Sequence, residues 1–513
     1  MENKNVERQQ KKYKYMTALG AGGYQEFVYE YCGVRNENAT RFVQAAMLEI
    51  LRKKEIVVDE FIVLLTERSR NETWEKTIIR QSNSIKERLK KKNPELFKSV
   101  ESELEYDDCW KDTKEYDGLK AVLENLGGIT LTVIDISDGK SIDEQWDIYQ
   151  KISNEIVSRE GEVNLIFDIT NGFRTIPMLA VSALDCIRRI ENVNVEYIFY
   201  GAMEAKSDDK IVPVFDFTML LDVMEWSQAL RMFQDYGISE PLCEIARNGI
   251  EESKNSKTGD LKNISESDTW KELIGAIDTF SKTIETGRGK YDKTRSNKEN
   301  CIALAALEVV RTIDIVIDME FEKENVLENT LLIPLIPILE QIRVSMQEFV
   351  KEDNFEIGLQ IIKWCRDKKK VQQGLTALEE TVTTYVCKLL NDLGVGVDEV
   401  NKNDRMDIVN KAVTGILHNR KDTRNKLKYS EEKYERFTKV KGELKKIVDE
   451  QKHKNKELTL MGLVDKIKKL RNDINHFGFS SKSNQCNDII EEFERCSLDF
   501  EKLVCTYESE KRE

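Results

Sequence analysis

Short apolar runs alternate with helical patterns over roughly the first 220 residues, and this alternation constrains the fold more than any other feature. The runs are rich in β-branched and aromatic residues and end at turn residues, which is typical of strands. Helical patterns at Ser141–Val157 and Arg174–Ile190 lie between them. Strands that alternate with helices predict a mostly parallel sheet covered by helices, which is a Rossmann-like α/β fold. The predicted strands are Tyr15–Leu19, Phe61–Thr66, Ile129–Ile136, Asn164–Ile169 and Val195–Tyr200.

An extra strand or hairpin is expected directly after the first strand. Phe27, Tyr29 and Tyr31 occupy alternate positions within Gln25–Cys32. Side chains two residues apart lie on the same face of a strand, so this spacing indicates an extended segment with one aromatic face.

Helical patterns replace the strand signals from about Leu221 onward. All six prolines lie at or before Pro337, so no proline interrupts a helix in the last third of the chain. We therefore expect an all-α bundle there, completed by a last helix over Asn487–Tyr507. Its helices are expected to be separated by glycines such as Gly394, Gly415 and Gly478.

A chain of 513 residues is too long for one ordinary core, so we expect several domains. The stretch Arg247–Asn300 is rich in Lys, Ser, Asn, Thr and Glu, which predicts a polar loop or insertion among the helices. The expected division is an α/β domain over residues 1–225, a helical linker or insertion over 226–395 and a helical bundle over 396–513.

Charge and cysteine spacing exclude several functional classes. A formal charge of −14 disfavours binding of long nucleic acids through many phosphate contacts, so any RNA contact must be local. Residues 420–456 are the exception, with 14 basic against 7 acidic residues, and form either an RNA-binding surface or a solvated helix face.

The ten cysteines include no CxxC pair and no Cys/His cluster, so we expect neither a zinc site nor a disulfide framework.

The N-terminal residues contain no apolar stretch of the kind that a signal peptide needs. Nowhere do roughly 18 apolar residues follow one another, as a membrane-spanning helix requires. The sequence therefore predicts a cytoplasmic protein that does not enter a membrane.

A glycine-rich loop follows the first predicted strand. Glycines allow backbone N–H groups to approach a phosphate without obstruction by a Cβ atom. The loop lacks the spacing of dinucleotide-binding or P-loop motifs, so a plain tight turn is the alternative. Its residues are Gly20, Ala21, Gly22, Gly23 and Tyr24.

A second loop follows the strand at Asn164–Ile169 and opens the helix that contains Pro177. Free N–H groups and the helix dipole favour an anion at such a place, and an arginine can add a bidentate phosphate contact. The alternative is that Asp168 or Thr170 only caps the helix and that Arg174 lies on the surface. The candidate ligand-binding residues are Asp168, Thr170, Asn171, Gly172, Phe173 and Arg174.

These two loops give the first half of the chain a resemblance to a known family. Together with the strand that contains Phe61 and the run from Tyr200 to Thr218, they resemble CRISPR-associated Rossmann-fold (CARF) sensor domains over roughly residues 13–226. The resemblance implies a domain that dimerises and binds a cyclic oligoadenylate across its two-fold axis. It places the phosphate and adenine contacts on Gly20–Tyr24 and on Thr170–Arg174.

The C-terminal candidates are Arg471, Asn472 and His476. Metal-independent RNA cleavage needs proton transfer, for which histidine is suited near neutral pH, and a fixed cation opposite the developing charge. The chain has only three histidines, and His476 follows Arg471 with four residues between them. Neither His418 nor His453 has an arginine at a similar spacing. The alternative is that Arg471 and Asp473 form surface pairs while His476 hydrogen-bonds at a helix end.

The segment from Arg471 to His476 resembles the signature of HEPN ribonucleases. On an ideal helix these two positions point about 140° apart, so one helix does not hold a complete site. The resemblance implies a dimer, or a multiple of one, in which two copies of the motif form one cleft. It implies that His476 is the acid or base, that Arg471 stabilises the phosphorane, and that Asn472 orients His476 or the substrate.

A CARF-like sensor followed by this motif resembles the ribonucleases of type III CRISPR systems. We therefore expect a single-stranded RNA endoribonuclease that acts in antiviral defence, with cyclic oligoadenylate as allosteric activator and neither a metal nor another cofactor. The alternatives are a ligand-sensing regulator, a non-catalytic scaffold, or an enzyme whose CARF domain mainly degrades its activator.

Overall fold

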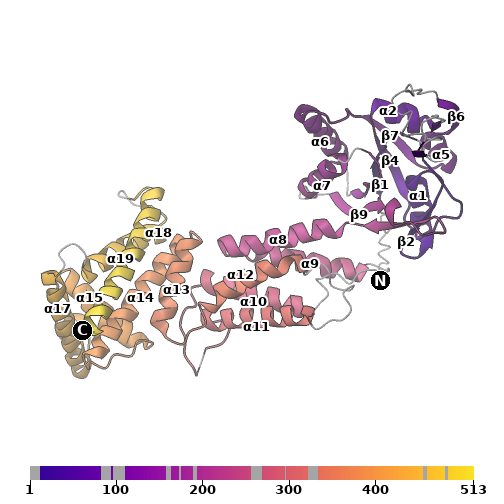
Figure 1. The fold of residues 1–513 in the computed structure, drawn as a ribbon. Coiled ribbons are helices and arrows are strands. Elements are labelled where there is room, and N and C mark those ends of the chain that lie inside the picture. The colour runs from indigo at the N-terminus through magenta and orange to yellow at the C-terminus, as the bar shows by residue number, and fades with distance from the viewer. Residues whose placement is uncertain are drawn as a thin grey trace, which may run out of the picture. The chain divides into compact units, whose positions relative to one another are not determined.

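The computed structural model describes residues 12–22, 24–82, 94–95, 110–157, 163–172, 175–188, 193–255, 268–294, 296–321, 333–454, 459–479 and 483–512 (Figure 1). The chain forms two compact units, Met1–Met224 and Glu225–Glu513. Their division lies one residue before the expected boundary at residue 225. The two helical segments expected on either side of residue 395 both belong to the second unit.

A twisted sheet with five parallel strands forms the centre of the first unit. Their order, β9-β8-β1-β4-β7, is that of a doubly wound fold, so the expected Rossmann-like architecture is confirmed. An antiparallel strand, β10, and the hairpin β2–β3 extend the β9 edge. The strands are β1 (Tyr13–Ala18), β2 (Val28–Tyr31), β3 (Val34–Arg35), β4 (Val58–Leu65), β7 (Thr130–Asp135), β8 (Val163–Asp168), β9 (Val193–Gly201) and β10 (Ile211–Asp216).

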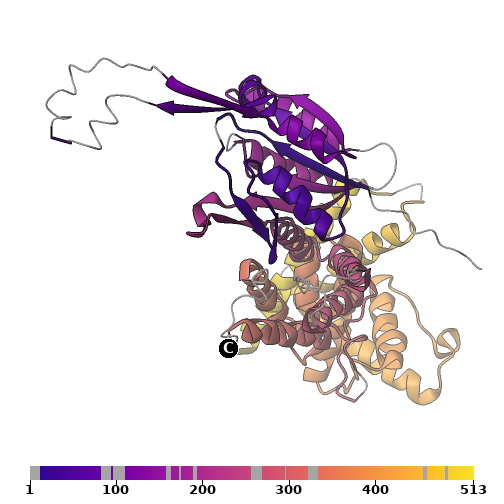
Figure 2. The same ribbon diagram turned by 90° about the vertical axis from the view of Figure 1, so that its right-hand side faces the viewer.

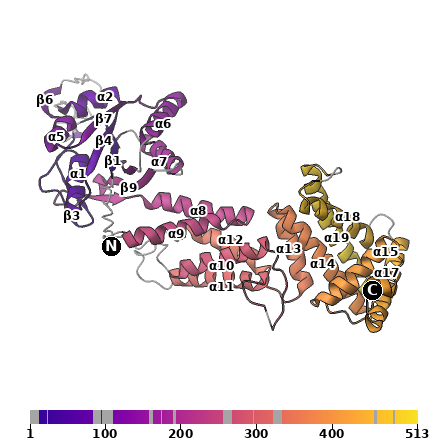
Figure 3. The same cartoon turned by 180° about the vertical axis from the view of Figure 1, so that it is seen from behind.

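Helices cover both faces of this sheet, as Figures 1 and 3 show. On one face α1 (Val43–Lys53) and α5 (Leu119–Leu126) build a core, and on the other α6 (Ile142–Ile156) and α7 (Thr175–Ile187) build a second. Strand β4 supplies both cores, because its alternate side chains point to opposite faces. A strand buried on both faces reads as a continuous apolar run, which is why β4 was recognisable from sequence.

A two-stranded antiparallel sheet, β5 (Lys76–Ser82) with β6 (Trp110–Asp117), was not expected from the sequence. Figure 2 shows these strands projecting from the main sheet at the top of the view. Most of their residues are polar or charged, so they lack the apolar runs by which the other strands were identified.

The second unit is helical and has one continuous hydrophobic core. Trp226 and Trp270 pack edge to face in it, with ring centroids 5.3 Å apart. The helices are α8 (Met219–Tyr236), α9 (Glu240–Asn255), α10 (Asp268–Glu285), α11 (Ile302–Phe321), α12 (Ile336–Gln347), α13 (Asn354–Asp367), α14 (Val371–Asp392), α15 (Asn410–Leu417), α16 (Arg424–Leu427), α17 (Glu431–Lys454), α18 (Leu460–Asn475) and α19 (Cys486–Arg512), with the π-helix η5 (Asn403–Val409) before α15.

Two expectations about this unit were wrong. The polar stretch Arg247–Asn300 is not a single loop, because α10 lies within it and buries Trp270, Ile277 and Phe280 at helical spacing. Its polar composition comes mostly from the residues on either side of α10, and partly from the solvent face of that helix. Gly415 does not separate helices but lies inside α15, where a Cβ atom would come within 2.3 Å of the Asp422 side chain.

Helices α14 and α19 approach closely at Gly374, and this contact yields a prediction. A Cβ atom there would lie 2.2 Å from Cζ of the buried Phe493 ring. We expect Gly374→Ala to lower the free energy of unfolding of the helical unit by about 1–3 kcal/mol in urea titrations, because the ring has to move in a packed core.

Gly275 in α10 is the matched control, because a Cβ atom there meets nothing within 4 Å. Gly275→Ala is expected to stabilise the unit slightly through its higher helix propensity. Equal effects of the two substitutions would contradict the proposed close packing of α14 on α19.

Candidate functional site

The two loops singled out in the sequence lie side by side at the carboxyl ends of β1 and β8. These strands pair in parallel with Thr17 opposite Asp168, at the point where the strand order of the sheet reverses. A Cβ atom on Gly20 would lie 3.5 Å from the Gly172 backbone nitrogen, so the loops are in contact. Open α/β sheets bind ligands in this position.

The Asp168 carboxylate joins the elements around these loops. It is fully buried, and its Oδ2 accepts hydrogen bonds from Thr17 Oγ1 at 2.9 Å and from Gln44 Nε2 at 2.7 Å. Its Oδ1 accepts from the Thr170 backbone N–H at 2.9 Å. Burial raises the pKa of Asp168 above the usual aspartate value, and these donors oppose that rise. The carboxylate therefore ties β1, α1 and the second loop together from below the surface.

Thr170 and Gly20 are held by further hydrogen bonds. Thr170 Oγ1 accepts from the Gly201 backbone N–H at 2.7 Å, which links the second loop to the end of β9. The Gly20 carbonyl accepts from Tyr24 Oη at 3.1 Å and from Thr73 Oγ1 at 2.8 Å. Burial raises the pKa of Tyr24 to about 12, so its hydroxyl stays protonated and able to donate.

The outer parts of both loops depend on glycine. Gly22 has a φ of +133° and Gly172 a φ of +100°, values that L-amino acids with a side chain rarely adopt. A Cβ atom on Gly172 would also lie 3.1 Å from the Ala18 Cβ. Gly23, Phe173 and Arg174 lie outside the described residues.

Sequence reasoning missed three residues that build this site, namely Gln44, Thr73 and Gly201. Gln44 left a signal, because it is a polar residue on the apolar face of the α1 sequence, where it is fully buried. The sequence gives no signal for Thr73 or Gly201, because their roles arise only when distant segments fold against the loops.

His476 stands at the C-terminal end of α18 and is exposed. Its backbone N–H donates to the Asn472 carbonyl at 3.0 Å, so the helix ends at this residue. Phe477, with a φ of +53°, and Gly478, with a φ of +68°, then turn the chain away. Phe477 and Phe479 are 86% and 91% exposed, so apolar rings flank the histidine.

Arg471 lies one and a half turns earlier on α18 and forms an ion pair with Glu379 of α14. Arg471 Nη1 is 2.5 Å from Glu379 Oε2, and the glutamate side chain is only 15% exposed. Arg471 Nε is buried without a hydrogen-bond partner among the described residues. The expected surface ion pair of Arg471 is thus present but largely shielded, and no hydrogen bond joins Arg471 to His476 in the described part of the chain.

Lys468 lies beside this ion pair. Its Nζ donates to Thr414 Oγ1 at 3.3 Å, and burial lowers its pKa because the charged form loses hydration. Cationic groups therefore gather on one side of α18, with Glu379 as their counter-charge.

Asp473 faces the following loop, where its Oδ2 accepts hydrogen bonds from the backbone and side-chain nitrogens of Asn484 at 2.8 and 2.9 Å.

The basic segment 420–456 is partly neutralised by ion pairs with two carboxylates that precede it and with one inside it. Lys433 pairs with Asp407, Arg436 with Asp404 and Lys441 with Asp422, at distances of 3.0, 2.6 and 2.7 Å. These pairs favour a structural role for three of its cations over contact with RNA.

The described residues contain neither a cluster of metal ligands nor a membrane-spanning helix. No group of three or more His, Cys, Asp or Glu side chains there could hold a metal ion. No helix in the described ranges is long and apolar enough to cross a membrane.

Comparison with known proteins identifies the first unit. Residues 15–204 match the family model described as the CARF domain of the CRISPR system endoribonuclease Csx1. This part of the chain is a CARF domain. The site at the ends of β1 and β8 lies within it, so the resemblance noted from the loop motifs is confirmed for the CARF domain.

Two further comparisons cover more of the chain than the CARF domain. The CRISPR-associated protein MJ1674 of Methanocaldococcus jannaschii is 23% identical over 377 residues, which are 72% of this chain and 51% of that protein. The chain thus spans about half the length of this relative. The structure of Enterococcus italicus Csm6 bound to cyclic hexa-2'-fluoro-hexa-dAMP aligns over 97% of this chain and 94% of that chain, with 9% identity and a TM-score of 0.37. A TM-score this low does not establish a common fold.

The buried hydrogen bonds of Asp168 predict a stability effect in the CARF domain. Thr17→Val keeps the side-chain shape but removes one donor to the carboxylate. We expect the free energy of unfolding to fall by about 1.5–3 kcal/mol at neutral pH, as is typical for a hydrogen bond to a charged group. Urea unfolding of the full chain, with hydrogen exchange at β1 and β8, measures it.

This deficit should depend on pH. The pKa of Asp168 is raised in the folded chain, and loss of a donor raises it further. The free energy of unfolding therefore falls as the pH rises from the pKa of Asp168 in the unfolded chain to its pKa in the folded chain. As the pH falls below the unfolded value of about 3.9, the carboxyl becomes protonated in both states and the deficit should shrink. Thr17→Ser keeps the hydroxyl and serves as control. A deficit that is the same at acidic and neutral pH would contradict the role given to the carboxylate.

Proposed function

We propose that this protein is a cyclic-oligoadenylate-activated, metal-independent endoribonuclease that cleaves single-stranded RNA in type III CRISPR antiviral defence. The observation that carries the proposal is a CARF domain with a glycine-lined site at its strand switch point, in one chain with an exposed His476 on the same helix as the half-buried Arg471–Glu379 ion pair. The first feature suits a sensor, and the second suits an effector under its control.

The activator is proposed to bind to the two loops of the CARF domain. A cyclic oligoadenylate is a ring of phosphates and adenines, and the positive-φ glycines Gly22 and Gly172 let backbone N–H groups approach such phosphates. The buried Asp168 side chain holds the loop while the loop backbone takes the ligand. A two-fold symmetric ligand calls for a homodimer, or a multiple of one, with one site across the axis.

The cleavage chemistry is assigned to the end of α18. The 2′-hydroxyl of a nucleotide attacks the adjacent phosphorus and gives its proton to a base, while the leaving 5′-oxygen takes a proton from an acid. His476 acts as acid or base, and Arg471 stabilises the phosphorane. Asn472 orients His476 or the substrate. The products are a 2′,3′-cyclic phosphate and a 5′-hydroxyl.

A second subunit is proposed to complete this site. The two positions diverge by about 140° along α18, and Glu379 holds the Arg471 guanidinium on the α14 side. The paired His476 and Arg471 of two chains would supply an acid, a base and two fixed cations to one cleft. The activator drives cleavage only if it binds the active arrangement more tightly than the resting one.

The assay that tests this proposal is cleavage of a fluorescent single-stranded RNA in EDTA, with and without each cyclic oligoadenylate. His476→Ala is expected to abolish activator-dependent cleavage, a loss of at least about 100-fold, because proton transfer is lost. His418→Ala is the matched control, since His418 is also exposed at the C-terminal end of a helix, α15, and should retain activity.

The outcomes separate the alternatives. Full cleavage by His476→Ala would contradict the catalytic assignment and leave a regulator, a scaffold or a CARF-based activator nuclease. Cleavage that needs no cyclic oligoadenylate would contradict the sensor assignment. Cleavage that EDTA stops would contradict a metal-independent reaction.

Gly172→Ala tests the activator site separately. A Cβ atom there would crowd Ala18 and meet an unfavourable φ, so the loop must shift. We expect affinity for the cyclic oligoadenylate to fall by about tenfold or more in equilibrium binding measurements, since backbone donors are displaced.

Gly128→Ala is the control, because Gly128 also has a positive φ, +75°, but lies in the turn before β7. It should keep normal affinity despite similar backbone strain. Equal losses in both variants would show general destabilisation and would contradict direct use of the Gly172 loop.

A further inference from the structure

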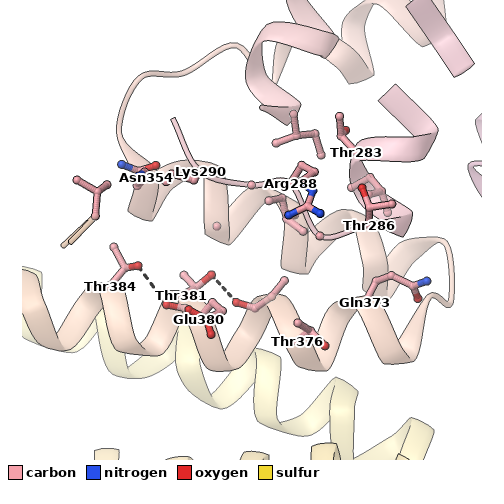
Figure 4. Close-up of a pocket in the computed structure, with 18 of the residues that line it drawn as sticks. Thr283, Thr286, Arg288, Lys290, Asn354, Gln373, Thr376, Glu380, Thr381 and Thr384 are labelled. Atoms are coloured by element: carbon pink, nitrogen blue, oxygen red, sulfur yellow. Dashed lines mark hydrogen bonds between the residues drawn. The ribbon is translucent and has the colours of Figure 1, made fainter. Parts of the chain in front are cut away.

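A cavity of about 670 Å³ lies within the helical unit, away from the residues assigned to RNA cleavage and to the activator. It is bounded by the connection between α10 and α11, by α13 and α14, and by η5 (Figure 4). Its volume falls in the range of about 300–1,000 Å³ that is typical of small-molecule sites. The face of α14 that lines it carries Gln373, Thr376, Glu380 and Thr384 at helical spacing.

The charge in this cavity favours an anion, although the whole chain is acidic. Arg405 is neutralised by Glu380, with Nη2 to Oε2 at 2.7 Å. Arg288 and Lys402 have no hydrogen-bond or ion-pair partner among the described residues. The four lining cations, Arg288, Lys290, Lys402 and Arg405, outnumber the three lining carboxylates, Glu285, Glu380 and Glu399, by one. Figure 4 shows the Arg288 guanidinium directed into the space above α14.

Other lining groups suit a ribose and a base. The side-chain amides of Gln372 and Gln373 have no hydrogen-bond partner among the described residues, and an amide offers both a donor and an acceptor to the edge of a base. Thr376 Oγ1 donates to the Gln372 carbonyl at 3.0 Å and keeps its lone pairs for a sugar hydroxyl. Ile361 and Met406 provide an apolar wall on which a ring can lie.

We propose that this cavity binds a phosphorylated ribonucleoside, either as a free mononucleotide or as one nucleotide of an RNA strand. Its phosphate contacts Arg288 and Lys402, and its base meets the amides of Gln372 and Gln373. A simple inorganic anion would use the cations but not the amides or the apolar wall. Occupancy also bears on the α18 site, because Glu380 faces the cavity while Glu379, the next residue of α14, holds Arg471.

The test is equilibrium binding to the full chain carrying His476→Ala, so that RNA persists through the measurement. The probes are AMP, GMP, CMP and UMP in one arm and a short single-stranded RNA in the other, with ribose 5-phosphate and inorganic phosphate for comparison. Arg288→Ala is expected to weaken binding of the preferred probe about tenfold or more, and Gln373→Ala several-fold, through loss of a charge-assisted and a neutral hydrogen bond.

Arg311→Ala is the matched control, because Arg311 is an arginine of the same unit that is mostly exposed and lies on α11 outside the cavity. It should bind normally, and so should Gly172→Ala, which separates this site from the CARF domain. Binding of only the mononucleotides, or of only the RNA, would show which of the two the cavity takes. Absence of binding by every probe, equal affinity for inorganic phosphate, or unchanged binding by both Arg288→Ala and Gln373→Ala would overturn the proposal. None of these outcomes depends on RNA cleavage.

Discussion

The buried Asp168 carboxylate is the interaction on which the CARF domain site depends. It lies at the end of β8, where hydrogen bonds from Thr17, Gln44 and the Thr170 backbone join two strands, one helix and one loop. A buried charge is costly unless donors surround it, so these contacts leave the loop little freedom. The glycines above it can then present their backbone outward on a rigid base, as a phosphate-binding loop requires.

Helix α14 plays a comparable role in the second unit. Glu379 and Glu380 are consecutive, so their side chains leave the helix about 100° apart and serve different neighbours. Glu379 holds Arg471 of α18, and Glu380 holds Arg405 beside the cavity. One helix therefore organises both the proposed catalytic cation and the proposed nucleotide site. A shift of α14 would reach both, which gives a physical route by which they could influence each other.

Several features of the fold and site could be predicted because local sequence carries them. Strand β4 is apolar from Phe61 to Leu65, and Ser141 caps α6 by accepting a hydrogen bond from the Glu144 backbone. The glycines of both loops follow clearly apolar strands, β1 and β8. The apolar residues of α10 recur at helical spacing, but the polar residues on either side of the helix dominated the composition of the stretch and hid that pattern. Composition averages over every residue of a segment, whereas packing of a helix depends only on the residues of its buried face.

Local sequence patterns alone specified the alternation of the five central parallel strands with helices, the change to an all-α second half, and the residue types at both candidate sites. These follow from periodicity and turn chemistry, which act over neighbouring residues. Only the tertiary structure decided that the loops after β1 and β8 touch, that Gln44 and Gly201 support them, and that Glu379 binds Arg471. Those pairs are far apart in sequence, and contacts of that kind arise from how whole elements pack, which no local pattern encodes.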